Sequence, residues 1–381
     1  MTQIEFIVPT LFGLEALAAK EIRELGYETT SVENGRVTFI GDEAAICRAN
    51  LWLRTAERVL VKMGEFEATT YEQLFEQTKA VPWPDWIPEN AKFPVKGYSL
   101  KSQLFSVPDC QSIIKKAVVE KMKEKYNTTW FQEDGPLYQI QFSLLKDKVT
   151  LMIDTSGDGL HKRGYREHAN EAPLRETLAA AMVMLSVWKP EKAFLDPFCG
   201  SGTIPIEAAL IGANIAPGLE REFVAQNWHR VPKELWWDAR REAHDKMRKN
   251  IKFHIYGSDI DHKAVKLSRE NVSLAGVGDY VIISNLPMNE IQSKDEYGCI
   301  ICNPPYGERL GELKEIEKLY RQMGQIFKKF DTWSYYILTS YENFEKLFGR
   351  KANKKRKLYN GMIKCDLYQY YGPKPPKNNV E

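Results

Sequence analysis

The sequence predicts an α/β protein whose C-terminal half is built on a mostly parallel sheet with helices on both faces. Two observations carry this prediction. From about residue 171 onward, segments with strand and helix patterns alternate, which is typical of such sheets. In "FLDPFCGSGT" at 194–203, a strand runs into a glycine-rich turn that opens a helix. With 381 residues, the chain is long enough for two or three domains.

The first half predicts two smaller regions that mix helices and strands. Residues 1–65 begin with the strand pattern "IEFIVPT", followed by the helix pattern "GLEALAAKEIRELG" and a second strand, "GRVTFIG". Residues 66–158 contain the helix pattern "DCQSIIKKAVVEKMKEKY" and two strand patterns, "LYQIQFSLL" and "KVTLMIDTS", joined by a short turn. We expect "GDGLHKRGYREHANEAP" to link this region to the second half.

The second half supplies the elements of the parallel sheet in order. The helix "LRETLAAAMVMLSVW" precedes the strand "KAFLDPF", and the helix "IPIEAALIG" follows it. The later strands are "KFHIYGSDID", "YVIISNL", "YGCIICN", "SYYILTS" and "KCDLYQYY". Residues 373–381, which are rich in proline and polar side chains, predict a disordered tail.

Composition narrows the class of protein. The net charge of +2 neither requires nor excludes a nucleic-acid partner. We expect no membrane span, since no apolar stretch is long enough, and a cytoplasmic location, since the N-terminus lacks a basic leader. "CIIC" at 299–302 lies on a predicted strand, where an offset of three places the two thiols on opposite faces. The histidines show no metal-binding spacing either, so we expect no metal site.

The glycine-rich turn at 194–203 favours a cationic ligand. A phosphate-binding loop would need a lysine after its last glycine, and a dinucleotide fingerprint would need a third glycine where Pro205 stands. Asp196, at the strand end, would repel a pyrophosphate. S-adenosylmethionine carries an ammonium and a sulfonium and no phosphate, so it fits. Asp259 ends the next strand, where a carboxylate can accept both ribose hydroxyls. The same pattern disfavours a nicotinamide-dependent dehydrogenase.

A second polar segment, "CNPPYGERL" at 302–310, follows another predicted strand. Proline fixes φ and lacks an N–H donor, so Asn303-Pro304-Pro305 should form a stiff, extended bend with free carbonyls. Tyr306 adds a flat ring beside it. By itself this motif is equally compatible with a rigid corner that has only a structural role.

Together these motifs resemble a known family. "DPFCGSGT", "GSDID" and "CNPPYGERL" resemble class I S-adenosylmethionine-dependent methyltransferases, and NPPY resembles the motif of enzymes that methylate exocyclic amines of bases. "HKRGYREHANEAPLRETLAAAM" resembles the lead-in of THUMP-domain RNA guanine-N2 methyltransferases of the RlmL-like ribosomal RNA family. The resemblance implies a Rossmann-like catalytic domain at 159–372, mostly parallel with an antiparallel last strand. It also implies a ferredoxin-like unit at 1–65 and a THUMP RNA-binding domain at 66–158.

The resemblance also implies the site residues. The cofactor, S-adenosylmethionine, would be bound by Pro173, Thr177, Asp196, Pro197, Cys199, Gly200, Gly202, Asp259, Ile260 and Asn285. The family usually has an aspartate where Asn285 stands, which bonds the adenine amine. The catalytic residues would be Asn303, Pro304 and Tyr306: two oxygen acceptors that orient the amine, and a ring on which an extruded base stacks.

Two basic clusters could contact the RNA backbone, although such clusters are often only solvated faces. The candidate RNA-binding residues are Lys115, Lys116, Arg309, Lys354, Lys355 and Arg356. Three alternatives to guanine-N2 methylation of 23S ribosomal RNA stay open: adenine-N6 methylation of RNA or DNA, guanine-N2 methylation of transfer RNA, and a non-catalytic RNA-binding or ribosome-assembly factor. The sequence does not indicate an oligomeric state.

Overall fold

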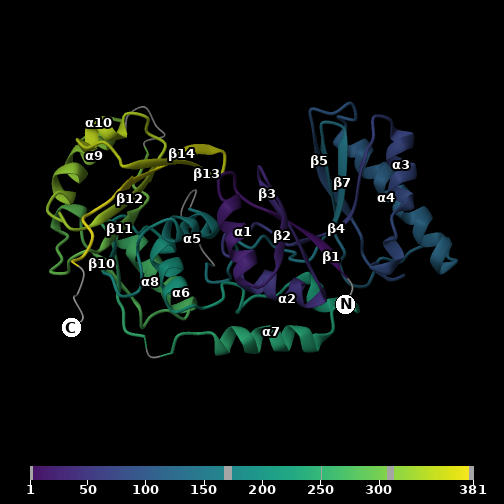
Figure 1. The fold of residues 1–381 in the computed structure, drawn as a ribbon, viewed down its shortest axis with the longest axis horizontal. Helices are drawn as coiled ribbons and strands as arrows, with labels where there is room; N and C mark the ends of the chain where they lie inside the picture. Colours follow the sequence, from purple (N-terminus) through teal and green to yellow (C-terminus); the bar gives the residue numbers. More distant parts are fainter. Residues whose placement is uncertain (1–2, 167–173, 250, 307–312, 377–381) are drawn as a thin grey trace. The chain divides into compact units, whose positions relative to one another are not determined.

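The chain forms two compact units, each assembled from separate segments. A computed structural model describes residues 3–166, 174–249, 251–306 and 313–376, and its ribbon is drawn in Figure 1. The first unit comprises residues 1–10, 18–160 and 221–242, and the second comprises residues 11–17, 161–220 and 243–381. Among the described residues, no helix has the length and apolar character needed to cross a bilayer.

The first unit is built on one seven-stranded sheet with the order β2-β3-β1-β4-β7-β6-β5. Its elements are β1 (Ile4–Pro9), α1 (Glu15–Glu24), β2 (Glu28–Glu33), β3 (Arg36–Gly41), α2 (Glu43–Trp52), β4 (Leu60–Glu67), α3 (Tyr71–Ala80), η1 (Trp83–Asp85), β5 (Val95–Leu100), α4 (Val107–Tyr126), β6 (Ile140–Leu145) and β7 (Lys148–Asp154), followed later by η2 (Val224–Asn227) and α7 (Lys233–Asp245). Because β4 pairs with β1 on one side and β7 on the other, the two regions predicted in the first half share one sheet.

The second unit has the order β10-β9-β8-β11-β12-β14-β13. Its elements are α5 (Glu176–Met184), β8 (Phe194–Asp196), α6 (Thr203–Gly212), β9 (Ile255–Asp259), α8 (His262–Leu274), β10 (Val281–Asn285), η3 (Met288–Glu290), β11 (Cys299–Cys302), α9 (Leu313–Phe327), β12 (Ser334–Thr339), α10 (Phe344–Phe348), β13 (Lys354–Asn360) and β14 (Ile363–Tyr370). Strands β8 to β12 run parallel, whereas β14 is antiparallel to β12. The predicted mostly parallel sheet with an antiparallel last strand is confirmed.

Two apolar layers cover the two faces of this second sheet. On one face, Cys299 and Ile301 of β11 pack with buried residues of α5, α6 and α8. On the other, Ile300 and Cys302 pack with buried residues of α9 and α10, and Figure 1 shows these helices beside the sheet. The two thiols of "CIIC" therefore lie on opposite faces, as the strand period predicted. Burial raises the pKa of the Cys299 thiol to about 12.

The long insertion between α6 and β9 takes part in the first unit. Arg48 of α2 forms an ion pair with Glu242 at 2.7 Å, and Arg230 pairs with Glu43 at 3.3 Å. These pairs hold residues 221–242 within that unit, although the sequence places them inside the segment predicted as catalytic. The predicted boundaries at 1–65, 66–158 and 159–372 stay a proposal.

Candidate active site

Polar side chains stand at the carboxyl ends of four neighbouring strands of the second unit. Asn285 ends β10 opposite Asp259 of β9, and Asp196 ends β8 beside β9. Asn303 follows β11, which pairs with β8 on the other side. The chain order reverses between β8 and β11, and in open α/β sheets ligands bind outside the strand ends at such a reversal. The topology therefore places four of the predicted site residues at one edge.

The glycine-rich turn is held closed by its own amides. The N–H of Cys199 donates to the Ser258 carbonyl at 2.9 Å, and the N–H of Gly200 donates to Asp259 Oδ2 at 2.9 Å. Gly202 has a φ of 83°, and a Cβ there would lie 2.4 Å from the Ser268 hydroxyl, so only glycine fits. The amides at the predicted positions are therefore used within the protein, and so is the Cys199 carbonyl, which accepts a hydrogen bond from the Gly202 N–H at 2.7 Å.

Asp196 is a buried carboxylate with one uncompensated oxygen. Its side chain is 1% exposed, and Oδ1 accepts a hydrogen bond from the Phe198 N–H at 3.0 Å. Oδ2 is buried without a partner among the described residues. Burial, with a smaller contribution from the charge of Asp259, raises the pKa of Asp196 well above its ordinary value. An acceptor of this kind fits the ammonium of S-adenosylmethionine, because a cation would offset the cost of burying the charge.

The next strand end offers a second carboxylate and an exposed apolar side chain. Asp259 is half-buried, and its Oδ1 accepts a hydrogen bond from the Asp261 N–H at 3.0 Å. Ile260 is 76% exposed. The amide nitrogen of Asn285 donates to the carbonyls of Asp259 and Ile260, at 2.9 and 3.0 Å. In this structure Asn285 thus shapes the backbone that carries Ile260.

The segment after β11 brings its two predicted acceptors together. Asn303 is half-buried and Pro304 is buried, and the Pro304 carbonyl accepts no hydrogen bond from the part of the chain that the structure describes. The Tyr306 hydroxyl donates a hydrogen bond to Asn303 Oδ1. Sequence reasoning assigned Tyr306 a ring for stacking and missed this bond.

Further residues hold this segment in place, and sequence reasoning missed them because they are far away in the chain. The Tyr320 hydroxyl of α9 donates to the Pro305 carbonyl at 2.8 Å and also lies 2.8 Å from Thr339 Oγ1 of β12. Asn360 and Cys365 contact the Tyr306 hydroxyl from the β13–β14 hairpin, and burial raises the pKa of Tyr306 well above its ordinary range.

The lead-in to α5 forms a buried charged cluster in the second unit. The guanidinium of Arg163 pairs with Glu207 of α6 at 3.3 Å, and the Tyr165 hydroxyl donates to the same carboxylate at 3.1 Å. Arg166 pairs with Glu176 at 3.3 Å. Thr177, predicted to close over the cofactor, follows Glu176 and is fully buried. Pro173 lies outside the described residues. The one signal for Glu207 in the sequence is a charge on an otherwise apolar helix.

The candidate RNA-binding side chains differ in whether they form ion pairs or hydrogen bonds within the protein. Lys115 pairs with Glu133 at 2.5 Å and donates to the Phe93 carbonyl at 3.1 Å, and burial lowers its pKa. Lys116 and Lys354 are exposed. The remaining candidates on β13 make contacts within the protein: Lys355 pairs with Glu345 at 3.2 Å, and Arg356 donates to the Gly13 carbonyl at 2.8 Å. Arg309 lies outside the described residues.

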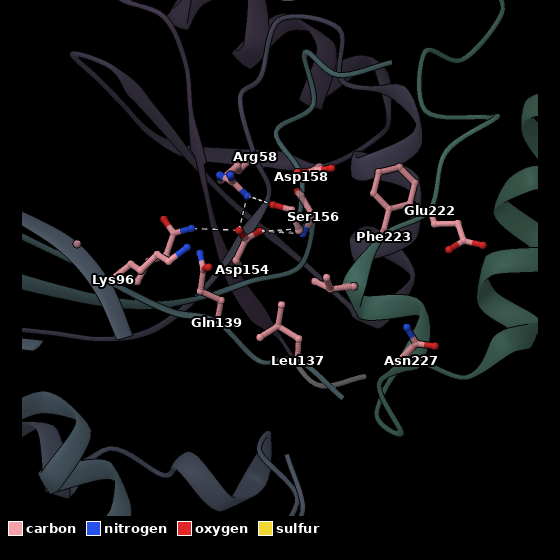
Figure 2. Close-up of a pocket in the computed structure, with 14 residues that line it drawn as sticks. Arg58, Lys96, Leu137, Gln139, Asp154, Ser156, Asp158, Glu222, Phe223 and Asn227 are labelled. Atoms are coloured by element: carbon pink, nitrogen blue, oxygen red, sulfur yellow. Dashed lines mark hydrogen bonds and ion pairs between the residues drawn. The ribbon is translucent and has the colours of Figure 1, made fainter. Parts of the chain in front are cut away.

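A separate cavity of about 700 Å³ lies in the first unit (Figure 2). Within it, Asp154 Oδ2 accepts hydrogen bonds from Arg58 at 2.5 Å and from Gln141 at 3.1 Å. Asp158 and Glu222 add negative charge to the lining. The cavity does not include any strand-end residue of the second unit. In the ranges that the structure covers, no group of three or more His, Cys, Asp or Glu is placed to bind a metal.

Comparison with known proteins identifies the family. The family described as "RMKL-like, methyltransferase domain" matches residues 163–369, which is more than half of the chain. The "RlmL ferredoxin-like domain" matches residues 5–60, and the THUMP domain matches residues 68–154. The chain belongs to the RMKL-like methyltransferase family. The resemblance predicted from the sequence is confirmed, and membership places the chain among S-adenosylmethionine-dependent methyltransferases.

Two curated relatives of this RMKL-like methyltransferase cover nearly all of the chain. "Putative RNA methyltransferase YpsC" of Bacillus subtilis is 52% identical over 379 residues, which are 99% of this chain and 98% of that protein. "Ribosomal RNA large subunit methyltransferase K/L" of Psychromonas ingrahamii is 34% identical over 393 residues, which are 99% of this chain and 52% of that protein. The chain thus spans about half the length of the second relative.

Two solved structures are also similar to it. One, described as a predicted N6-adenine-specific DNA methylase from Listeria monocytogenes, is 52% identical with a TM-score of 0.94, covering 98% of this chain and 97% of that chain. The other, described as "SMU.472, a putative methyltransferase complexed with SAH", is 43% identical with a TM-score of 0.94, covering 98% of this chain and 100% of that one.

Proposed function

We propose that this RMKL-like methyltransferase methylates the exocyclic N2 amine of a guanine in large-subunit ribosomal RNA. The observation that carries the proposal is the position of Asn303 and Pro304 at the sheet edge that also carries Asp196 and Asp259. Two oxygen acceptors for an amine thus stand beside two carboxylates suited to the cofactor. The relative named for the large ribosomal RNA subunit supports the choice of substrate.

In this proposal, residues at different strand ends bind different parts of the cofactor. Asp196 Oδ2 accepts a hydrogen bond from the ammonium, together with the turn carbonyls of Pro197 and Gly200, and Asp259 accepts hydrogen bonds from the ribose hydroxyls. Cys199 and Gly202, which are hydrogen-bonded to each other, shape the turn around the methionine end. Exposed Ile260 packs against the adenine, held in position by the bonds from Asn285. When bound, S-adenosylmethionine supplies a methyl group already activated by a positive sulfur. Pro173 and Thr177 stay in the proposal as the residues that close the site.

The chemistry required of the chain itself is orientation. A guanine amine is a poor nucleophile, because its lone pair is conjugated with the ring. The Asn303 side-chain oxygen and the Pro304 carbonyl accept its two N–H groups, favour a more tetrahedral nitrogen and stabilise the positive charge that develops there. Tyr306 aligns the Asn303 amide through its hydroxyl and offers its ring to the base. Positioning then supplies most of the rate.

The RNA is bound by both units in this proposal. Residues 1–65 and 66–158 position the RNA, with Lys116 on the surface of α4, and exposed Lys354 of β13 contacts the RNA backbone. Lys115, Lys355 and Arg356 are engaged within the protein, so we give them at most a supporting role. A protein that modifies ribosomal RNA in this way would act in the cytoplasm.

The experiment that tests this function is nucleoside mass spectrometry of total RNA from cells with and without the gene. We expect one N2-methylguanosine to disappear from the large-subunit ribosomal RNA fraction, and to return when the intact gene is restored. An unchanged nucleoside profile in every RNA fraction would overturn the proposal.

Adenine-N6 methylation is the second candidate. It is favoured by the similar structure from Listeria monocytogenes, which is described as a predicted N6-adenine-specific DNA methylase. The two acceptors at Asn303 and Pro304 would serve an adenine amine as well as a guanine amine. Loss of N6-methyladenosine in the same comparison of cells would support it instead.

A further inference from the structure

The β13–β14 hairpin ends in an exposed methionine. Asn360 pairs with Ile363, so the turn consists of only two residues, Gly361 and Met362. Gly361 has a φ of 62°, which suits glycine at the first central position of a type II′ turn and makes the tip rigid. Met362 is 97% exposed, a higher fraction than for any other large hydrophobic side chain in the described ranges. This side chain therefore buries almost no apolar surface and contributes almost nothing to the stability of the fold.

A single exposed apolar residue needs no explanation, but the position of this one is informative. Asn360, two residues before Met362, contacts the hydroxyl of Tyr306, and Cys365, three residues after it, contacts the same hydroxyl. Both strands of the hairpin thus contact the tyrosine that we propose as the stacking platform. The methionine at the tip therefore lies within three residues, along the chain, of both contacts with that tyrosine.

Positive charge lies near the tip. Lys357 of β13 and Lys364 of β14 are exposed and form no ion pair with any residue that the structure describes. Lys354 is also exposed, but it lies at the far end of β13, opposite Gln369. β13 is the edge strand of the sheet. A second exposed apolar side chain, Phe12, packs edge-on against Tyr359 at 5.9 Å between ring centroids. Basic side chains flanking an exposed apolar tip match an RNA backbone flanking a gap between bases.

We propose that Met362 is a wedge that enters the base stack of the RNA at the position vacated by the target nucleotide. Taking a base out of a stack costs free energy, and apolar side chains inserted between bases are a general way to offset that cost. Methionine suits this task because it is unbranched, flexible and polarizable. The proposal rests on the proposed function only in requiring that the target is a base in RNA.

The test compares three variants on two RNA substrates. The variants are Met362→Ala, which removes the wedge, Met362→Leu, which keeps its volume, and Leu274→Ala, a control that shortens an apolar side chain 52% exposed at the end of α8. The methylated nucleotide is first mapped on unmodified 23S ribosomal RNA transcribed in vitro, with the wild-type protein. Two hairpin RNAs are then made around it. They differ only opposite the target, where one has the pairing partner and the other an abasic site.

We expect Met362→Ala to lower the single-turnover rate on the paired RNA by roughly tenfold to a hundredfold and to leave the rate on the abasic RNA within about twofold of wild type. Met362→Leu and Leu274→Ala should match wild type on both RNAs. Melting temperature and cofactor affinity should be unchanged in all three variants. An equal loss on both RNAs would show a general RNA contact, and no loss on either would also overturn the wedge. If wild type methylates no RNA at all, the proposed function fails instead.

Discussion

The hydroxyl of Tyr306 donates a hydrogen bond to the side-chain oxygen of Asn303, three residues earlier in the same segment. This bond fixes the rotation of the Asn303 amide, whose oxygen keeps a second lone pair for a substrate. The carbonyl of Pro304 stands next to it without a partner among residues 3–166, 174–249, 251–306 and 313–376. The segment therefore presents two acceptors in a fixed orientation, and each part of it has a separate, measurable role.

The variant Asn303→Ala should lose the methyl transfer step and little else. The half-buried side chain contributes little to the core, so the melting temperature and cofactor affinity should stay close to wild type. The single-turnover rate on RNA should fall by about 10² to 10³, as when one preorganised hydrogen bond to a transition state is removed. Single-turnover methylation, calorimetry and thermal melts check this. A folded variant with wild-type turnover would show that Asn303 has only a structural role.

The variant Tyr306→Phe separates the ring from the hydroxyl. It keeps the stacking surface but releases the Asn303 amide, so we expect a rate lower by roughly threefold to tenfold, in line with the net value of about 1 kcal/mol for one hydrogen bond. Tyr306→Ala removes both and should in addition weaken productive RNA binding by roughly 1–3 kcal/mol. Rates measured over a range of RNA concentrations distinguish the two effects. Equal defects in both variants would contradict a stacking role for the ring.

Tyr320→Phe tests the support behind the segment. The hydroxyl it removes binds the Pro305 carbonyl and Thr339, so the segment loses its tie to β12. We expect a stability loss of about 1 kcal/mol, with a lower rate and an unchanged affinity for the cofactor. Chemical denaturation measures the first quantity and calorimetry the last. A changed cofactor affinity with an unchanged rate would instead show that Tyr320 supports the cofactor-binding residues and not the segment after β11.

Asp196→Asn should make the cofactor-free protein more stable at neutral pH. Burial raises the folded-state pKa of Asp196 above its ordinary 3.8, so the folded protein binds the proton more tightly than the unfolded chain. Its contribution to stability is present below pH 3.8 and is lost as pH rises through the raised folded-state value. Asparagine carries no charge and avoids that loss. The difference in melting temperature between variant and wild type should therefore grow with pH.

The same variant should respond less to the cofactor. S-adenosylmethionine should raise the melting temperature of wild type and leave Asp196→Asn nearly unaffected, because the variant has no charge for the ammonium. Melting curves over a pH series, with and without the cofactor, provide both readouts. A variant that is less stable than wild type at neutral pH and still stabilised by the cofactor would refute this role for Asp196.

The sequence predicted the second sheet well, because the patterns that indicate most of its strands and turns lie within short stretches of the chain. The predicted strands are short apolar runs, with Asp196 and Asp259 at the ends of two of them and Asn303 directly after a third. The basic strand β13 has no such run, and the sequence pattern does not predict it. Strand order in a doubly wound sheet then brings their carboxyl ends to one edge. The identity of these residues and their common location could therefore be predicted before any contact was known.

Contacts between distant segments could not be predicted in this way. The pairing of β4 with both β1 and β7 merges two regions that periodicity alone presents as separate. Residues 221–242 join the first unit through ion pairs such as Arg48–Glu242, which no local pattern reveals. The contacts of Tyr320 and Asn360 with the segment after β11 are long-range in the same sense.

The measurement that tests the central claim most directly is methylation of unmodified RNA in vitro by the purified full chain. Large-subunit ribosomal RNA transcribed in vitro is incubated with the protein and S-adenosylmethionine carrying a labelled methyl group, then digested to nucleosides and analysed by mass spectrometry. Asn303→Ala serves as the matched control. We predict labelled N2-methylguanosine with the wild-type protein and almost none with the variant. Label found only in N6-methyladenosine, or equal labelling by both proteins, would contradict the account.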